Sequence, residues 1–343
     1  MPLEGETARG YALPMATRLL THPACLDHVT PPGHPERVDR LRAINKLLAH
    51  PHFAELDRKE APLGSDEDIA RAHTEAYIRH IRAALPDPQQ EWQQLDPDTW
   101  MSPGSLEAAL RGVGAAIAGV DAVFKGEAAN VFCAIRPPGH HAESRRAMGF
   151  CLFNNAAIAA LHARARYDAE RVAVVDFDVH HGNGTQDIFW SDRNLFYGST
   201  HQMPLYPGTG AVSETGAGNI FNAPLRAGDG SDRFREALRS VILPAVDAFG
   251  PDLIVISAGF DAHHRDPLGG LELSEKDFVW ASLYIMEMAD KHAEGRVVSV
   301  LEGGYDLAAL ASSVGAHVQA LMRGTGELEA VAIAVDDEDE IND

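Results

Sequence analysis

Residues 172–186, with the sequence VAVVDFDVHHGNGTQ, decide how the rest of the chain is interpreted. The stretch begins with four apolar residues rich in β-branched side chains, which predict a buried strand at 172–179. Asp176, Asp178 and His180 follow at two-residue spacing, which places their side chains on one face of an extended chain. Carboxylate oxygens and an imidazole nitrogen on one face favour zinc over calcium or magnesium. Because an ordinary polar strand end before a turn has the same pattern, the remaining sequence must decide.

Short apolar runs alternate with amphipathic segments through most of the chain. This alternation predicts an α/β fold of three layers, with a mostly parallel central sheet and helices on both faces. A polar, proline-rich stretch at 86–104 interrupts it and is interpreted as a long surface loop. We expect strands at 17–21, 131–135, 172–179, 195–199, 253–257 and 297–301, and helices at 35–49, 66–85 (a pair), 106–124, 155–167, 185–191, 231–249, 274–292 and 307–322.

No linker interrupts this alternation, so we expect one domain spanning residues 15–325. The preceding residues, 1–14, are interpreted as a flexible N-terminus. Residues 326–343 contain a run of acidic side chains and are expected to form an acidic C-terminal tail in solvent.

The composition excludes some partners. The 343 residues include 29 Lys and Arg against 50 Asp and Glu, a formal net charge of −21. This charge argues against nucleic acid as a direct partner, because phosphate binding needs clustered cations. Three scattered cysteines form neither a disulfide framework nor a Cys-x-x-Cys zinc knuckle, and the sequence shows no signal peptide or membrane-spanning run. We therefore expect a cytoplasmic protein without membrane contact, compatible with a homo-oligomer.

Unusual polar residues follow five of the predicted strands directly. Because ligand sites in open parallel sheets lie beyond the carboxyl ends of the strands, we expect these residues to form one site. The five segments are RPPGHH at 136–141, DFDVH at 176–180, STH at 199–201, AGFD at 258–261 and EGGY at 302–305.

The chemistry of these residues favours metal-assisted hydrolysis of a carboxamide. Asp178, His180 and Asp261 can supply three metal ligands and leave positions open for water and substrate, as in a catalytic zinc site. His140 and His141 follow a Pro-Pro-Gly turn, and one can accept a proton from water while the other donates a proton to the leaving group.

Further residues support this chemistry. Each catalytic imidazole needs an orienting partner on its other nitrogen, and the sequence offers Asp176 for one and Asn183 for the other. Tyr305 can donate its hydroxyl proton to a developing oxyanion opposite the metal. Phe150 and Tyr206 lie in glycine-rich loops, where two facing rings would form a slot for an extended alkyl chain; ordinary core packing explains them equally well.

Taken together, the motifs resemble the zinc-dependent histone deacetylase family, in its class II-like form found in bacterial amidohydrolases. The resemblance runs from about residue 21 to residue 322. It implies an arginase-like α/β fold, one catalytic zinc, and hydrolysis of an acetylated amine to acetate and free amine. The motifs that carry it are RPPGHH at 136–141, GFC at 149–151, DFDVHHGNGT at 176–185, SAGFD at 257–261 and LEGGY at 301–305.

The resemblance assigns the matching residues to four roles. It implies zinc ligands at Asp178, His180 and Asp261. The acid–base and carbonyl-polarising groups it implies are His140, His141 and Tyr305. The acyl-lysine tunnel it implies begins at Gly149 and Phe150, with Tyr206 as a second wall. A bound K⁺ or Na⁺ is implied at the backbone carbonyls of Asp176, Asp178, His180, Ser199 and Thr200.

Four positions refine the resemblance. Asn183 stands where class I members carry aspartate, which indicates a class II-like chain. Tyr305 is retained, unlike the histidine of one vertebrate subclass that acts poorly on acetyl groups. Leu268 matches the position where a polyamine-selective branch carries an acidic residue, so acetylated lysine is favoured over acetylpolyamines or other small acylated amines, which stay the alternative. Asp98, in the 86–104 stretch, is a candidate for holding a substrate amide or ammonium group at the rim.

Two other functions compete with this interpretation. A dinuclear manganese ureohydrolase of the same fold needs additional carboxylates to bridge two metals, and the sequence offers one complete ligand set. A catalytically silent acetyl-lysine binder would need no proton-transfer pair such as His140 and His141. His263 and His264 are interpreted as loop or rim residues rather than as ligands.

Overall fold

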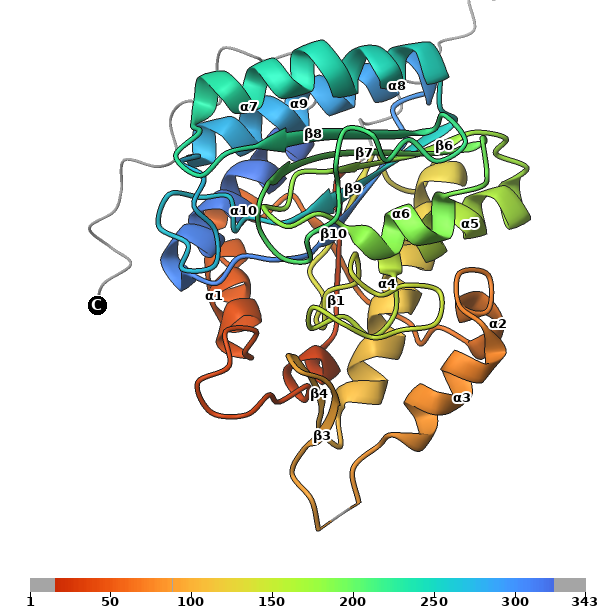
Figure 1. Cartoon of the computed structure of the whole chain (residues 1–343), viewed down its shortest axis with the longest axis vertical. Coiled ribbons are helices and arrows are strands. Elements are labelled where there is room, and N and C mark those ends of the chain that lie inside the picture. Colours follow the sequence, from red (N-terminus) through yellow and green to blue (C-terminus); the bar gives the residue numbers. More distant parts are fainter. Residues whose placement is uncertain (1–15, 88, 324–343) are drawn as a thin grey trace, which may run out of the picture.

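The computed structural model describes residues 16–87 and 89–323. The predicted flexible N-terminus at 1–14 and the predicted acidic tail at 326–343 lie outside the described residues. At the centre of the molecule is an eight-stranded sheet with the order β2-β1-β5-β10-β9-β6-β7-β8 (Figure 1). All neighbouring strands of this sheet are parallel, which confirms the predicted α/β class.

The strands of the sheet are β1 (Arg18–Thr21), β2 (Asp57–Glu60), β5 (Val131–Cys133), β6 (Val172–Asp176), β7 (Leu195–Gln202), β8 (Ile220–Leu225), β9 (Leu253–Ala258) and β10 (Val297–Leu301). A separate antiparallel hairpin consists of β3 (Gln93–Asp96) and β4 (Thr99–Met101). The helices are α1 (Asp39–Leu48), α2 (Asp66–Ile69), α3 (Glu75–Ala83), α4 (Ser105–Phe124), α5 (Asn155–Tyr167), α6 (Asn183–Phe189), α7 (Ser231–Ala237), α8 (Leu243–Phe249), α9 (Glu275–His292) and α10 (Leu307–Arg323). Single turns of helix are found at η1 (Pro23–Leu26), η2 (Pro51–Phe53) and η3 (Leu238–Ile242).

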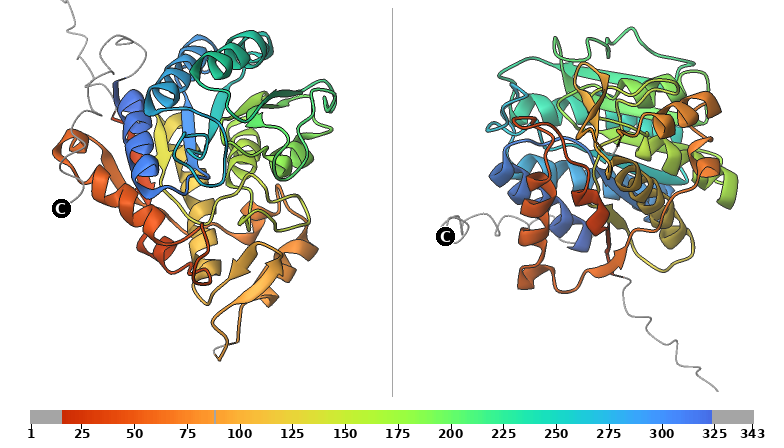
Figure 2. Two further views of the ribbon diagram at one scale, coloured as in Figure 1. Left: turned by 60° about the vertical axis from the view of Figure 1, so that its left-hand side comes forward. Right: turned by 90° about the horizontal axis from the view of Figure 1, so that it is seen from below.

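Helices cover both faces of the sheet, as Figures 1 and 2 show. Side-chain alternation along β10 identifies which helix covers which face. Val298 lies against α4, where a Cβ atom at Gly119 would be 3.1 Å from its Cγ1. The next residue, Ser299, faces the other way, and its hydroxyl lies 2.8 Å from Nε2 of His317 in α10. The sheet is therefore the middle of the three layers that the alternating pattern predicts.

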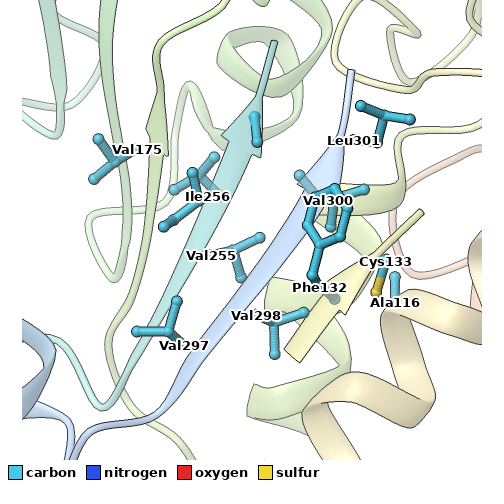
Figure 3. Packing of buried hydrophobic residues seen from close by; sticks show 14 of the residues in the cluster. Ala116, Phe132, Cys133, Val175, Val255, Ile256, Val297, Val298, Val300 and Leu301 are labelled. Atoms are coloured by element: carbon cyan, nitrogen blue, oxygen red, sulfur yellow. The ribbon is translucent and has the colours of Figure 1, made fainter. Parts of the chain in front are cut away.

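The core is formed by the central strands and the small residues of α4. Because both faces of β6, β9 and β10 are covered, every residue of these strands is buried. In Figure 3, Val255 and Ile256 of β9 lie beside Val298 and Val300 of β10, with Phe132 of β5 next to them. This packing holds the ends of neighbouring strands in a constant relative position.

Three predicted boundaries near the site are wrong. The strand predicted at 195–199 continues to Gln202. The strand predicted at 172–179 ends at Asp176, because the N–H groups of Asp178, Val179 and His180 donate to carboxylate oxygens instead of to a neighbouring strand. The N–H of Asp178 donates to Asp176 Oδ1 at 3.1 Å, and that of His180 donates to Asp178 Oδ1 at 2.9 Å. The three side chains therefore converge through tight turns and not through strand alternation. The helix predicted at 35–49 begins at Asp39.

The prediction of an irregular surface loop at 86–104 is also wrong. This stretch contains the β3–β4 hairpin, and Thr99 and Met101 on β4 are fully buried. Two strands of the main sheet escaped prediction for a physical reason. β2 reads Asp-Arg-Lys-Glu, the charged composition of an edge strand, and β8 contains Pro224 at the opposite edge. In the described ranges, no helix combines the length and the apolarity required to cross a membrane.

Candidate active site

The polar motifs predicted to form one site lie at the ends of adjacent strands. β5, β10, β9, β6 and β7 are consecutive in the sheet, and a motif follows or ends each of them. Because all five strands are parallel, their carboxyl ends meet at one edge of the sheet. The structure therefore brings together segments separated by up to 169 positions in the sequence, from Arg136 to Tyr305.

Asp178, His180 and Asp261 form a compact buried group at this edge. Their ligand atoms all lie within 4.8 Å of one another. Nδ1 of His180 is 3.2 Å from Asp178 Oδ1 and 3.1 Å from Asp261 Oδ2. No second group of three metal-ligating side chains is found within residues 16–87 and 89–323.

The electrostatics of this group favour a bound cation. Burial and the neighbouring Asp178 carboxylate raise the pKa of Asp261 to about 7. Burial opposes a charge on His180, but hydrogen bonds to Asp178 and Asp261 outweigh it and raise its pKa to about 10. Two buried carboxylates that repel each other and one imidazole are a donor set that suits zinc. The residues present therefore fit a zinc ion.

Close backbone packing keeps the two carboxylates in place. A Cβ atom at Gly259 would lie 1.9 Å from Asp178 Oδ2, and one at Gly303 would lie 2.1 Å from Asp261 Oδ2. Such distances are far below van der Waals contact, so the chain after β9 and β10 can approach only through glycine. The N–H of Gly303 uses this approach to donate to Asp178 Oδ2 at 2.9 Å.

His140 and His141 lie next to each other beside this group, with their ring planes inclined at 44°, and have different partners. Their ring centroids are 4.0 Å apart. Nδ1 of His140 lies 3.0 Å from Asp176 Oδ2, and Nδ1 of His141 lies 2.9 Å from Asn183 Oδ1. The amide of Asn183 is oriented by its Nδ2 group, which donates to Glu143 Oε1 at 2.8 Å. Each imidazole thus presents its Nδ1 to an acceptor, which leaves Nε2 free for proton transfer.

The different surroundings of His140 and His141 shift the pKa values of the two imidazoles in opposite directions. Burial opposes a charge on His140, but Asp178 and Asp176 outweigh it and raise its pKa to about 10. Burial and the neighbouring rings of His140 and His180 lower the pKa of His141 well below its ordinary value. Neighbouring groups with opposite shifts are typical of an acid–base pair.

Tyr305 lies beside the metal-ligating group and is held by Arg40. The guanidinium carbon of Arg40 is 4.8 Å from the centroid of the Tyr305 ring. Nε of Arg40 donates to the carbonyl of Gly304 at 2.6 Å, and its Nη2 donates to that of Glu302 at 2.5 Å. Burial raises the pKa of the Tyr305 hydroxyl well above its ordinary value, with Arg40 opposing this shift. The phenol therefore stays protonated and able to donate a hydrogen bond.

Sequence reasoning missed Arg40 and its partner Glu36. Nη1 of Arg40 donates to Glu36 Oε1 at 2.9 Å, and Arg136 donates to both oxygens of the same carboxylate at 2.5 and 2.6 Å. All three side chains are fully buried. The one available signal was the placement of Arg40 next to Leu41, on the apolar side of helix α1.

Phe150 and Tyr206 contact different residues of the site. The Phe150 ring meets Tyr305 edge-on at a centroid distance of 5.8 Å. The Tyr206 ring lies 5.2 Å from that of His141 and is 36% exposed. The two aromatic rings therefore flank Tyr305 and His141, and Tyr206 does so at the surface.

The remaining predicted rim residues take part in internal contacts. Leu268 is half-buried, and its N–H donates to Asp266 Oδ1 at 3.0 Å. Asp98 Oδ1 accepts the N–H of Gly149 at 3.1 Å, so this carboxylate is engaged by the protein itself. His263, interpreted from sequence as a loop or rim residue, is buried, and its Nε2 lies 3.4 Å from Glu275. The sequence interpretation missed that the loop after β9, which contains His263, packs against the start of α9.

The residues expected to bind a monovalent cation are also adjacent. Asp176 pairs with Ser199 across β6 and β7, and Thr200 follows on β7. All three are buried, together with Asp178 and His180. Binding of K⁺ or Na⁺ by their carbonyls stays a prediction.

Comparison with known proteins identifies the family. The family model described as histone deacetylase domain matches residues 34–321. The chain belongs to the histone deacetylase family. This family membership confirms the resemblance drawn from the motifs, and with it a deacetylase or amidohydrolase type of enzyme.

Similar proteins in the histone deacetylase family come from several kingdoms. The chain is 39% identical over 300 residues to a probable deacetylase of Archaeoglobus fulgidus, covering 85% of this chain and 82% of that protein. It is 42% identical over 286 residues to a histone deacetylase-like amidohydrolase of Pseudomonas aeruginosa, covering 81% and 74%. The crystal structure of the HDA15 HD domain matches with a TM-score of 0.84 and 34% identity, covering 93% of this chain and 90% of that chain.

Proposed function

We propose that the protein is a zinc-dependent deacetylase that removes acetyl groups from the ε-amine of lysine in proteins or peptides. The observation that carries this proposal is the placement of the His140–His141 pair and Tyr305 around the buried Asp178, His180 and Asp261 group. A binding protein for acetyl-lysine would not need two imidazoles with separate orienting partners.

The chain's own residues divide the work of amide hydrolysis. When bound, zinc supplies a Lewis acid that polarises the acyl carbonyl and acidifies water. His141 faces a neutral amide, that of Asn183, so its imidazole is available to accept a proton from the attacking water. His140 faces the carboxylate of Asp176, which favours the imidazolium that donates a proton to the leaving amine. Tyr305 donates its hydroxyl proton in a hydrogen bond to the developing oxyanion.

The surroundings of these groups support an alkylamine substrate. Phe150 and Tyr206 offer aromatic faces to a linear alkyl chain that ends in the acyl group. Leu268, at the half-buried position after Asp266, adds no charge that would attract a second ammonium group. We therefore favour acetyl-lysine over acetylpolyamines.

A side-by-side turnover assay tests this proposal. The purified protein is assayed on an acetyl-lysine peptide, on longer acyl-lysines and on acetylpolyamines, with a hydroxamate inhibitor as control. We expect the highest kcat/KM on the acetyl-lysine peptide and one zinc per chain by metal analysis. Higher turnover of acetylpolyamines would contradict the substrate, and two tightly bound metals per chain would contradict the mononuclear site.

A further inference from the structure

The backbone at Gly149 and Phe150 adopts an unusual conformation next to the reacting groups. Both residues have positive φ angles, +57° and +68°. For an aromatic residue this left-handed region is disfavoured, because Cβ crowds the following carbonyl. The surrounding structure must therefore hold Phe150 in place.

The tip of the β3–β4 hairpin provides these contacts. The N–H of Phe150 donates to Thr99 Oγ1 at 3.0 Å, and the Thr99 hydroxyl donates to Asp98 Oδ1 at 2.9 Å. The same carboxylate oxygen accepts the N–H of Gly149 at 3.1 Å. These three hydrogen bonds form a closed ring that binds two consecutive backbone amides. Because Thr99 is fully buried, water cannot replace its hydroxyl in this ring.

His34 fastens the hairpin tip from the other side. Its Nδ1 accepts the N–H of Glu36 at 3.1 Å, so its Nε2 carries the proton and donates to the carbonyl of Asp98 at 3.0 Å. The His34 ring also meets the Phe150 ring edge-on, with centroids 4.7 Å apart and an angle of 72° between the planes. The hairpin tip, His34 and the Phe150 ring thus form one connected unit.

This unit touches the reaction centre directly. A Cβ atom at Gly149 would lie 2.3 Å from Cδ2 of His141, so the bound backbone lies against that imidazole. The Phe150 ring lies edge-on to Tyr305. A small displacement of the hairpin tip would therefore move the aromatic ring relative to the groups that act on the acyl group.

We propose that Thr99 and Asp98 are positioning residues that hold the Phe150 ring where it contacts the alkyl chain of the substrate. In this role Asp98 acts through the backbone N–H of Gly149. The identity of the alkyl chain rests on the proposed deacetylase function. The positioning role predicts that loss of the Thr99 hydroxyl weakens binding of ligands that pass Phe150 and spares ligands that reach only the metal-ligating group.

Two hydroxamates separate these ligands. Acetohydroxamic acid has no linker, whereas a hydroxamate with a linear six-carbon linker must extend past Phe150. In Thr99→Val, which keeps the side-chain shape, we expect about tenfold weaker inhibition by the long hydroxamate, the effect of one lost hydrogen bond. We expect a similar rise in KM for the acetyl-lysine peptide, with kcat changed less than about twofold. Thr99→Ser, which keeps the hydroxyl, should restore wild-type values.

Every other outcome contradicts the positioning role. Equal weakening of both hydroxamates would indicate general damage to the site, and unchanged inhibition by both would show that the ring of hydrogen bonds does not matter. If Thr99→Val does not fold, Thr99→Ala, which also lacks the hydroxyl, replaces it, with the same expected difference between the two hydroxamates. Failure of the proposed function is distinct, because it is seen in the wild-type protein itself, as higher turnover of acetylpolyamines or as a lack of both zinc and acetohydroxamic acid binding.

Discussion

Tyr305 is oriented by two charged side chains, Arg40 and Asp266, from distant parts of the sequence. Arg40 lies over its ring, and Asp266 accepts its backbone N–H at 2.6 Å. The same carboxylate accepts the N–H of Leu268, so the rim loop and the tyrosine loop share one anchor. The phenol is therefore fixed at both its ring and its backbone, as the proposed hydrogen bond to a developing oxyanion requires.

Removal of the Tyr305 hydroxyl should slow catalysis without loss of metal. In Tyr305→Phe we expect kcat on an acetyl-lysine peptide to fall by roughly 10²- to 10³-fold, the effect of one lost oxyanion donor. Zinc content and the affinity for acetohydroxamic acid should stay near wild type, since the three ligands are untouched. Wild-type kcat in this variant would remove Tyr305 from the mechanism.

The proton-transfer role proposed for His141 leads to a second prediction. His141→Ala should lower kcat by roughly 10²- to 10⁴-fold, the range for loss of a positioned general base. Zinc measured by metal analysis should be retained. His264→Ala is the matched control. Because His264 is exposed, the turnover of this variant should equal that of the wild type. Equal turnover of the two variants would show that His141 takes no part in proton transfer.

At the scale of elements, Glu36 joins helix α1 to the ends of two strands. Arg136, which follows β5, and Arg40, which reaches the loop after β10, both donate to this single carboxylate. Although burial opposes its charge, Arg136 and the nearby His28 hold the pKa of Glu36 well below its ordinary value. Two buried guanidinium groups therefore depend on one buried carboxylate for their compensation.

Neutralising Glu36 should destabilise the whole domain. In Glu36→Gln we expect the free energy of unfolding to fall by about 3–5 kcal/mol, because two buried cations lose their counter-charge. Urea denaturation measures this change. Glu107→Gln, which removes a largely exposed partner of Arg111, should cost roughly 0–1 kcal/mol. A similar small effect for Glu36→Gln would show that the guanidinium groups are compensated elsewhere.

At the scale of the whole molecule, buried neutral histidines join the layers. The backbone N–H of Asn154 donates to Nε2 of His73. Nδ1 of His73 therefore carries the proton and donates to the carbonyl of Glu143. In the core, His317 of α10 lies between the hydroxyls of Ser282 in α9 and Ser299 in β10. Burial lowers the pKa of His73 to about 4 and that of His317 to about 3. Both imidazoles are therefore neutral in the folded protein at pH values where the unfolded chain would take up protons.

This difference predicts a loss of stability in mild acid. The unfolded chain binds protons at these histidines below a pH of about 6.5, while the folded protein does not until pH falls to about 4 and 3. Their contribution is complete above pH 6.5 and decreases as pH falls below it, by up to about 1.4 kcal/mol per pH unit for each histidine.

Urea denaturation between pH 7 and pH 4.5 measures this slope. His317→Asn keeps polar groups for both serines and should reduce the slope by about 1.4 kcal/mol per pH unit, since one titrating group is removed. His80→Gln, at an exposed position of α3, should leave the slope unchanged. An unchanged slope in His317→Asn would show that other groups control the acid sensitivity.

Much of the fold and of the reacting groups follows from the sequence by itself. Short apolar runs that alternate with amphipathic segments indicated the parallel strands. The position of Asp178, His180, Asp261 and Tyr305 after strands indicated a common edge. Both inferences use only the order of neighbouring residues along the chain, because hydrophobic periodicity and side-chain chemistry can be recognised within a short stretch of sequence. The edge strand β2 was missed because its four residues are all charged and show no hydrophobic pattern. It forms a strand through backbone pairing with β1.

The opening stretch, residues 172–186, shows where local reasoning ends. Its sequence determined which side chains could hold a metal. The tertiary structure decided the turns after Asp176 and the order of the strands. It also decided how closely Gly259 and Gly303 approach the carboxylates of Asp178 and Asp261. The same is true of Phe150, held by Thr99 and His34 from distant segments. Such contacts form only when the folded chain brings separate segments together, so no local pattern encodes them. The sequence determined the chemistry available to this protein, and the tertiary structure decided the geometry in which that chemistry is held.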